Sequence, residues 1–181
     1  EQSALKTVQI SREVQEHYLQ ISQILARFQS ALKNSFDDEQ RRAVMDALGQ
    51  AGSDYRWNCY SVGFSGELTQ LPIPEMVTFL DLVLQYVDHS LRANKRSDAL
   101  YHAYNILHLE PELASISHLH EMLEGQVAIL SSGMLSGEES LALLESMRRS
   151  KLYRADQHSY ILYPDRDPAG FLEKNCITSA Q

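Results

Sequence analysis

"PEMVTFLDLVLQYVDHSL", residues 74–91, is the stretch that decides the fold class. Apolar side chains recur in it at intervals of three and four residues, which predicts an α-helix that begins at Pro74. The apolar positions on its main face are Met76, Phe79, Leu80, Val83, Leu84, Val87 and Leu91. Because Val77, Leu82 and Tyr86 add apolar surface at other angles, we expect this helix to be the central and most buried element.

The residues before this stretch predict two more helices. Residues 4–35 form one long helix in this interpretation, with a narrow apolar seam along it. The seam consists of Val14, Tyr18, Ile21, Leu25, Phe28 and Leu32. It packs either against another helix of the same domain or against a second copy of the chain. Asp37 and Gln40 then match a capping box for a short helix, which we expect Gly49 and Gly52 to end.

Residues 49–73 show no clear period, and we interpret them as a long ordered loop. This loop contains Tyr55, Arg56 and the only Trp of the chain, Trp57. Flat aromatic surfaces beside hydrogen-bonding groups are typical of a sugar or peptide contact surface. The alternative is that these rings close the end of a helical bundle, and both interpretations stay open.

Helical patterns continue after the central stretch. We expect helices at residues 98–109, 113–131 and 136–150, where Ser136 and Glu139 match a second capping box. The segment before Pro164 is expected to be extended, and Asp167 is expected to open a last short helix that ends near Asn175. The fold class that follows is all-α: a single domain, residues 1–181, of six to seven helices with a long aromatic loop and a short extended C-terminal segment.

Composition excludes several classes of function. The 24 acidic and 16 basic residues leave a net charge of -8, which argues against nucleic acid as a partner. Apolar runs are too short for a membrane span, so we expect no membrane partner and a cytoplasmic location. The two cysteines are far apart, which suggests a reducing compartment. Without a glycine-rich phosphate-binding motif, we expect no cofactor.

Two groups of polar residues are candidate sites. Asp98, His102 and Asn105 share one face of the helix predicted at 98–109, and a carboxylate beside a histidine is typical of a general base. The alternative is a capping aspartate with a histidine that faces solvent. In the 113–131 helix, Glu121 and Glu124 lie near His120, but the second histidine of a zinc motif is missing, so we expect no metal.

The C-terminal segment "LYRADQHSYILYPDR", residues 152–166, is crowded with polar and aromatic residues. Its tyrosines form a rigid clasp, with Arg154, Asp156 or Gln157 as partners of their hydroxyl groups, in the interpretation that we favour. In the alternative, Asp156 and Gln157 face a ligand. The candidate ligand-binding residues of the whole chain are Tyr55, Arg56, Trp57, Asp98, Tyr101, His102, Asn105, Glu121, Glu124, Asp156, Gln157 and Tyr160, and the catalytic residues are unknown.

Three segments carry a resemblance: "NKRSDALYHAYNIL" (94–107), "MLEGQVAILSSGMLSGEESLALLESMRRS" (122–150) and "LYRADQHSYILYPDRDPAGFLEKN" (152–175). Over residues 60–177, the chain resembles the later part of large multidomain bacterial proteins associated with cellobiose-phosphorylase-like carbohydrate enzymes. The resemblance implies a partial α-toroid and a domain excised from a larger protein. It departs at two positions, since we would expect Gly where the chain has Ala99 and Asn where it has His158.

The resemblance implies that the chain is a helical domain of a protein of carbohydrate metabolism, which contributes substrate contacts or scaffold to a glycoside-processing enzyme. Its partners would then be a carbohydrate and the other domains of the parent protein. The alternative is a non-catalytic interaction module, which uses the seam of the first helix to bind a partner or to form a homodimer. The sequence decides neither whether the domain is an enzyme nor its substrate.

Overall fold

The computed structural model describes residues 6–165 and 168–175. It is 55% helical and 15% strand, and the strands form three small antiparallel sheets. The all-α prediction, whether as a bundle or as a partial toroid, is therefore wrong, and the fold is mixed α/β. The chain divides into two compact units. Unit 1 runs to Asn94 and also includes Asn105–His118, whereas unit 2 includes Lys95–Tyr104 and the described residues from Leu119 onward.

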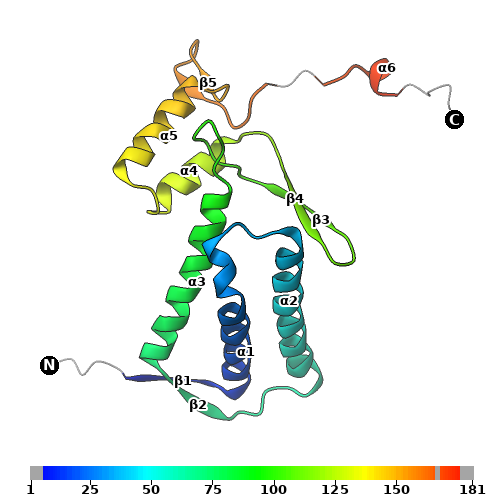
Figure 1. Ribbon diagram of the computed structural model, residues 1–181, viewed down its shortest axis with the longest axis vertical. Coiled ribbons are helices and arrows are strands. Elements are labelled where there is room, and N and C mark those ends of the chain that lie inside the picture. The colour runs from blue at the N-terminus through cyan, green and yellow to red at the C-terminus, as the bar shows by residue number, and fades with distance from the viewer. Residues whose placement is uncertain (1–5, 166–167, 176–181) are drawn as a thin grey trace. The chain divides into compact units, whose positions relative to one another are not determined.

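Unit 1 contains the three longest helices, α1 (Arg12–Phe28), α2 (Asp38–Ser61) and α3 (Ile73–Ala93). A 3-10 turn, η1 (Gln29–Lys33), extends α1. Figure 1 shows α1 between α2 and α3. The strands β1 (Thr7–Ser11) and β2 (Leu68–Pro72) pair antiparallel at one end of these helices.

The helix predicted at residues 4–35 is present, but its predicted start is wrong. Residues 7–11 form β1, and α1 begins only after Ser11, whose hydroxyl accepts a hydrogen bond from Val14 N. Ser11 stops the helix from extending backward because its own backbone is extended, as an N-cap requires. The predicted capping box at Asp37 and Gln40 is confirmed, with both hydrogen bonds present at the start of α2.

The long aromatic loop predicted at residues 49–73 is wrong. α2 continues through Gly49 and Gly52 as far as Ser61, and only residues 62–67 form a loop before β2. Each glycine costs a helix about 1 kcal/mol relative to alanine, which is too little to end a helix that is also held by tertiary contacts. Ala51 lies between the two glycines and is buried, so it provides one such tertiary contact.

The helix predicted at residues 98–109 is also wrong. Its second half is the strand β3 (Asn105–Leu109), which pairs with β4 (Ala114–His118) where the first half of the 113–131 helix was predicted. Two arginines of α2 hold this hairpin, since Arg41 donates a hydrogen bond to Ala114 O and Arg42 to Glu110 O. When a short segment mixes apolar and polar residues, contacts of this kind with a distant helix decide whether it forms a strand or a helix.

Unit 2 contains the helices α4 (Leu123–Ser131), α5 (Gly137–Arg149) and α6 (Phe171–Lys174). The second capping box is confirmed, since Ser136 and Glu139 exchange both hydrogen bonds at the start of α5. The strands β5 (Tyr153–Arg154) and β6 (Ser159–Tyr160) form a short hairpin. Asp167, the predicted start of the last helix, lies outside the described residues.

The buried side chains are few and are divided between the units. Among described residues, unit 1 buries Leu25, Ala51, Leu71 and Ala114, and unit 2 buries Leu100, Tyr101, Gln126, Ile129, Leu143, Met147 and Leu152. No residue of α3 is fully buried, so the prediction that it is the most buried element is wrong. A search of the described helices found none with the length and hydropathy of a membrane span.

Candidate functional site

The inner face of α3 packs on the apolar seam of α1. The rings of Tyr18 and Phe79 meet edge to face with their centroids 4.9 Å apart, and the hydroxyl of Tyr86 donates a hydrogen bond to Leu25 O at 2.7 Å. Burial raises the pKa of Tyr86. The seam of the first helix is thus used inside unit 1, which is one of the two arrangements that the sequence left open.

The outer face of α3 carries a second apolar row. Val77, Leu80, Leu84 and Val87 are 48%, 48%, 56% and 45% exposed, and Leu91 continues the row half-buried. Their spacing of three, four, three and four residues is the heptad spacing of a helix that pairs with another helix. We call these five residues the outer seam. At 1.5 Å per residue, it runs for roughly 21 Å along α3.

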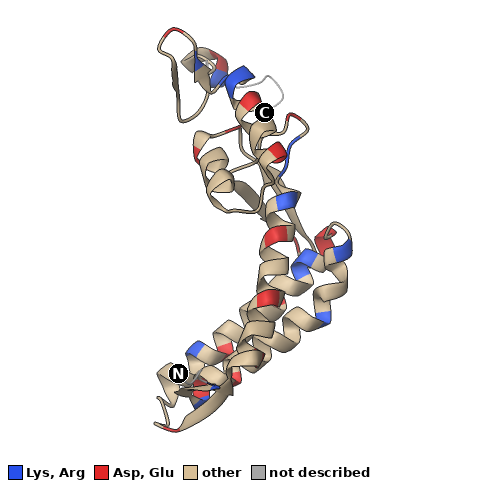
Figure 2. Cartoon of the chain, turned by 90° about the vertical axis from the view of Figure 1, so that its left-hand side faces the viewer, with Lys and Arg blue, Asp and Glu red and all other residues tan. Residues whose placement is uncertain are grey.

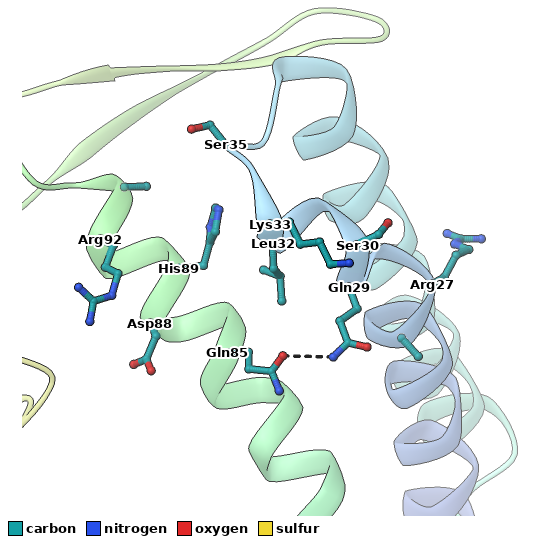
Figure 3. Close-up of a pocket in the computed structure, with 12 residues that line it drawn as sticks. Arg27, Gln29, Ser30, Leu32, Lys33, Ser35, Gln85, Asp88, His89 and Arg92 are labelled. Carbon is teal, nitrogen blue, oxygen red and sulfur yellow. Dashed lines mark hydrogen bonds between the residues drawn. The ribbon is translucent and has the colours of Figure 1, made fainter.

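A hollow of about 1020 Å³ lies between η1 and the end of α3. Gln29 donates a hydrogen bond to the side-chain oxygen of Gln85 across it at 3.1 Å, and a ring nitrogen of His89 lies 2.7 Å from Asn34 O. Although Arg27 and Arg92 line the hollow, their side chains point to opposite sides of it in Figure 3. The cationic groups therefore do not converge on one anion.

Three of the predicted site residues lie on the second half of α2. Tyr55 faces α1, where its ring stacks on His17 with centroids 4.6 Å apart, and its pKa is raised by burial and then by the nearby Cys59. Trp57 is 72% exposed and Tyr60 is 86% exposed. Because they lie three residues apart on a helix, their side chains are neighbours on its surface. Arg56 is also exposed and contacts the hydroxyl of Ser53.

Titratable groups gather where α1 meets the loop at 62–67. Glu13 accepts a hydrogen bond from the backbone N–H of Ser65 at 2.8 Å, and hydrogen bonds from the side chain and backbone of Ser65 lower the pKa of Glu13 to about 2. The half-buried Cys59 is near this point, beside Tyr55. Nowhere in the described ranges do three or more His, Cys, Asp or Glu side chains gather in a way that could hold a metal ion.

Asp98 closes a tight turn in unit 2 and does not lie on a helix. Arg96 donates two short hydrogen bonds to its carboxylate, at 3.0 and 2.8 Å, and this contact is the main reason that the pKa of Asp98 is lowered. The same guanidinium lies 3.6 Å from Glu121. The structure therefore brings two predicted site residues together, on one arginine.

Asp156 lies in an equivalent arrangement in the β5–β6 turn. Arg154 donates hydrogen bonds to it at 2.9 and 2.8 Å, which lower the pKa of Asp156, and lies 3.5 Å from Asp165. Gln157 accepts a hydrogen bond from the hydroxyl of Ser159, and the ring of Tyr160 lies 5.2 Å from that of Tyr153. The segment is thus a hairpin held by an ion pair and by two tyrosine rings whose planes are tilted by 59°, and Tyr160 remains 37% exposed.

The other predicted residues have separate positions. The backbone of the buried Tyr101 exchanges two hydrogen bonds with the side chain of Gln126, each 2.8 Å long, which satisfies a fully buried amide. Glu124 accepts a hydrogen bond from the hydroxyl of Tyr104 at 2.7 Å. Asn105 lies in β3, where its oxygen is 2.7 Å from His118 Nδ1.

The predicted polar row of Asp98, His102 and Asn105 is not formed on one helical face. Asp98 lies in a turn, His102 lies half-buried in the extended segment after it, and Asn105 begins a strand. By unit, Tyr55, Arg56, Trp57 and Asn105 are in unit 1, and the other eight candidates are in unit 2. Acidic and basic positions are mixed along the described chain, as Figure 2 shows.

The sequence interpretation missed the outer seam of α3, although a signal for it is present. In residues 74–91, the apolar positions exceed what one buried face needs, and Val77, Leu80, Leu84, Val87 and Leu91 by themselves have heptad spacing. The same excess underlies the prediction that this helix is the most buried element, which the structure contradicts. Comparison of the chain with protein-family models and with curated proteins found no match.

Proposed function

We propose that this chain is a non-catalytic interaction domain in which the outer seam of α3 docks a helix supplied from outside these 181 residues. The observation that carries the proposal is the exposure of four large apolar side chains at heptad spacing on a 21-residue helix. Contiguous exposed apolar surface of this kind marks interaction sites in water-soluble proteins, whereas single exposed apolar residues do not. The sequence suggested an interaction module that binds through the seam of α1. Because α3 already packs on that seam, the proposal places the binding surface on the outer seam of α3 instead.

The energy available at the outer seam is sufficient for a measurable complex. Burial of a whole Val or Leu side chain stabilises by about 1.5–3 kcal/mol, so covering the exposed half of each contributes about 1 kcal/mol. Four such side chains, with the seam of the partner, offset part of the cost of association. We therefore expect an affinity in the micromolar range or weaker for a single docked helix.

A model peptide tests the proposed function. A peptide of three heptads, with Leu at the two seam positions and Gln at the flanking positions, is titrated against the chain by calorimetry. We expect binding by the wild-type chain and at least a tenfold loss for Leu84→Glu, because a buried carboxylate without a partner is costly. The control is Leu109→Glu on β3, which also replaces an exposed leucine and leaves binding unchanged.

The proposed function fails if the wild-type chain does not bind the peptide, or if Leu84→Glu binds it as tightly as the wild type does. Thermal unfolding followed by circular dichroism verifies that both variants are folded. Because Leu84 is 56% exposed, its replacement is expected to change the melting temperature little.

The exposed pair Trp57 and Tyr60 favours a second candidate, a carbohydrate contact within a larger bacterial protein of carbohydrate metabolism. Two neighbouring aromatic rings on a rigid helix offer a flat surface on which a sugar ring can stack. The exposed Asp54 and Arg56 add hydrogen-bonding groups nearby in the chain. The resemblance implies the same kind of function, and of the two rings Tyr60 lies within residues 60–177, whereas Trp57 precedes them.

The second candidate is testable because Trp57 is the only Trp of the chain, so its fluorescence reports on this surface alone. Titration with cello-oligosaccharides is expected to give a saturable change in emission, and Tyr60→Ala is expected to weaken binding by about tenfold through loss of stacking. Tyr163→Ala, which removes an exposed tyrosine of unit 2, serves as the control. An unchanged emission at saturating sugar, or equal binding by Tyr60→Ala, would exclude this candidate.

A further inference from the structure

We infer that the helix docked on the outer seam is amphipathic and basic, with Lys or Arg residues that flank its own apolar seam. This inference rests on the proposed function and adds the chemistry of the partner to it. It follows from the charges that border the outer seam and from the poor fit of a second copy of this chain.

The acidic border consists of Asp81 and Asp88, which are seven residues apart. Each directly follows a residue of the outer seam, Leu80 and Val87, so both carboxylates lie on the same side of it. Both residues are exposed, and neither forms an ion pair with any residue in the described ranges. The opposite border, Met76, Val83 and Ser90, has no charge.

The cations near this border lie further from the seam. Arg92 follows Asp88 by four residues, and Arg27 and Lys33 line the hollow from α1 and η1, across from α3. On a helix, Asp88 and Asp81 lie about 60 and 80 degrees from the middle of the outer seam, while Arg92 lies about 100 degrees from it. A docked helix therefore meets the two carboxylates first. Residues that flank the seams of paired helices decide partner choice by charge.

A second copy of the chain fits this surface poorly. In an antiparallel pair, the border with Asp81 and Asp88 faces the same border of the other copy, so four carboxylates would approach one another. In a parallel pair, this border faces Met76 and Val83 of the other copy, which would take the carboxylates out of water beside apolar side chains. A partner helix with basic borders avoids both costs and gains attraction instead.

Two further peptides test the inference. Both have the Leu seam of the neutral peptide. One has Lys and the other has Glu at every flanking position. Repulsion between these like charges keeps two copies of the same peptide from pairing. We expect the Lys peptide to bind the chain at least tenfold more tightly than the Glu peptide at low salt, and this ratio to shrink as salt is added. Leu84→Glu is expected to weaken the binding of the Lys peptide.

Charge reversal provides the decisive variant. Asp81→Lys with Asp88→Lys is expected to reverse the preference, so that the Glu peptide binds more tightly. Glu110→Lys with Glu112→Lys makes the same change in net charge in the turn between β3 and β4, and is expected to keep the preference for Lys. If both double variants weaken the preference for the Lys peptide equally, the preference depends only on the net charge of the chain and not on Asp81 and Asp88. That result would overturn the inference.

The outcomes separate the inference from the proposed function. If the neutral, Lys and Glu peptides all bind equally and Leu84→Glu abolishes their binding, the inference is overturned and the proposed function stands. If no peptide binds in a way that depends on Leu84, the proposed function itself fails. If sedimentation shows that the wild-type chain dimerises and Leu84→Glu is monomeric, the occupant is a second copy, and the basic partner is overturned.

Discussion

Ala99 and His158 are the non-glycine residues of the described chain with a left-handed backbone, at φ of 64° and 50°. Ala99 directly follows Asp98, and His158 comes two residues after Asp156. Each aspartate is paired with an arginine two residues before it, Asp98 with Arg96 and Asp156 with Arg154. Ala99 and His158 are the two positions where the resemblance leads us to expect Gly and Asn. Both of those residue types adopt this backbone at little cost, whereas Ala is strained by its Cβ.

At the residue scale, we predict that Ala99→Gly stabilises the protein. A left-handed alanine costs about 1–2 kcal/mol, and glycine removes this strain while it adds entropy to the unfolded chain, so a net gain of about 0.5–1 kcal/mol is expected. The measurement is the free energy of unfolding from urea titration. The matched control is Ala142→Gly in α5, which is expected to destabilise by about 1 kcal/mol. A loss of stability in Ala99→Gly would contradict the prediction.

At the scale of elements, the same residue type has opposite roles in two helices. Gly49 and Gly52 lie in α2 with open space where a Cβ would be. Gly125 lies in α4, where a Cβ would come within 2.8 Å of Ala103 Cβ and 3.1 Å of its Cα. The segment that approaches Gly125 so closely is extended, not helical.

This difference predicts opposite effects of alanine. Gly49→Ala and Gly52→Ala should each stabilise by up to about 1 kcal/mol, because alanine favours the helix and meets nothing. Gly125→Ala should destabilise in spite of the same helical preference, because the backbone of Ala103 must move. Thermal unfolding of the three variants by calorimetry measures the signs. A Gly125→Ala variant as stable as the wild type would show that residues 101–104 can shift freely.

At the scale of the whole molecule, the apolar surface is unequally used. In the described part of unit 1, the buried residues are two leucines and two alanines, while the outer seam of α3 remains largely exposed. The proposed function follows from this imbalance: apolar residues selected for pairing with a second helix contribute to a complex and little to the isolated unit. The loss of peptide binding expected for Leu84→Glu tests whether this exposed apolar surface forms the complex.

Local signals in the sequence predicted several elements correctly. Both capping boxes, at Asp37 and Ser136, are formed, because a cap depends only on residues three apart. The 21 residues of α3 are helical as the apolar period predicts, with a start within one residue of Pro74. Longer-range features failed: the strands β3 and β4 and the second half of α2 depend on contacts with distant residues.

The candidate site shows the same limit. The sequence suggested Asp98 and Asp156 as candidate ligand-binding residues, and in the structure each is paired with an arginine two residues away in a turn. It also marked the aromatic residues near Trp57, but as a loop, because the glycines before them suggested a helix end. The outer seam was visible as an excess of apolar residues, yet a sequence cannot distinguish a helix buried on all sides from one with an unpartnered face.

The sequence by itself determined the caps, the period of α3 and the acidic net charge, because each depends on residue type or on neighbours within one turn of helix. Only the tertiary structure decided which apolar face of α3 is covered, since that depends on where the seam of α1 packs. Tertiary contacts likewise turned residues 105–118 into a hairpin and carried α2 through its glycines. Burial and pairing are properties of distant residues brought together, and no local pattern contains them.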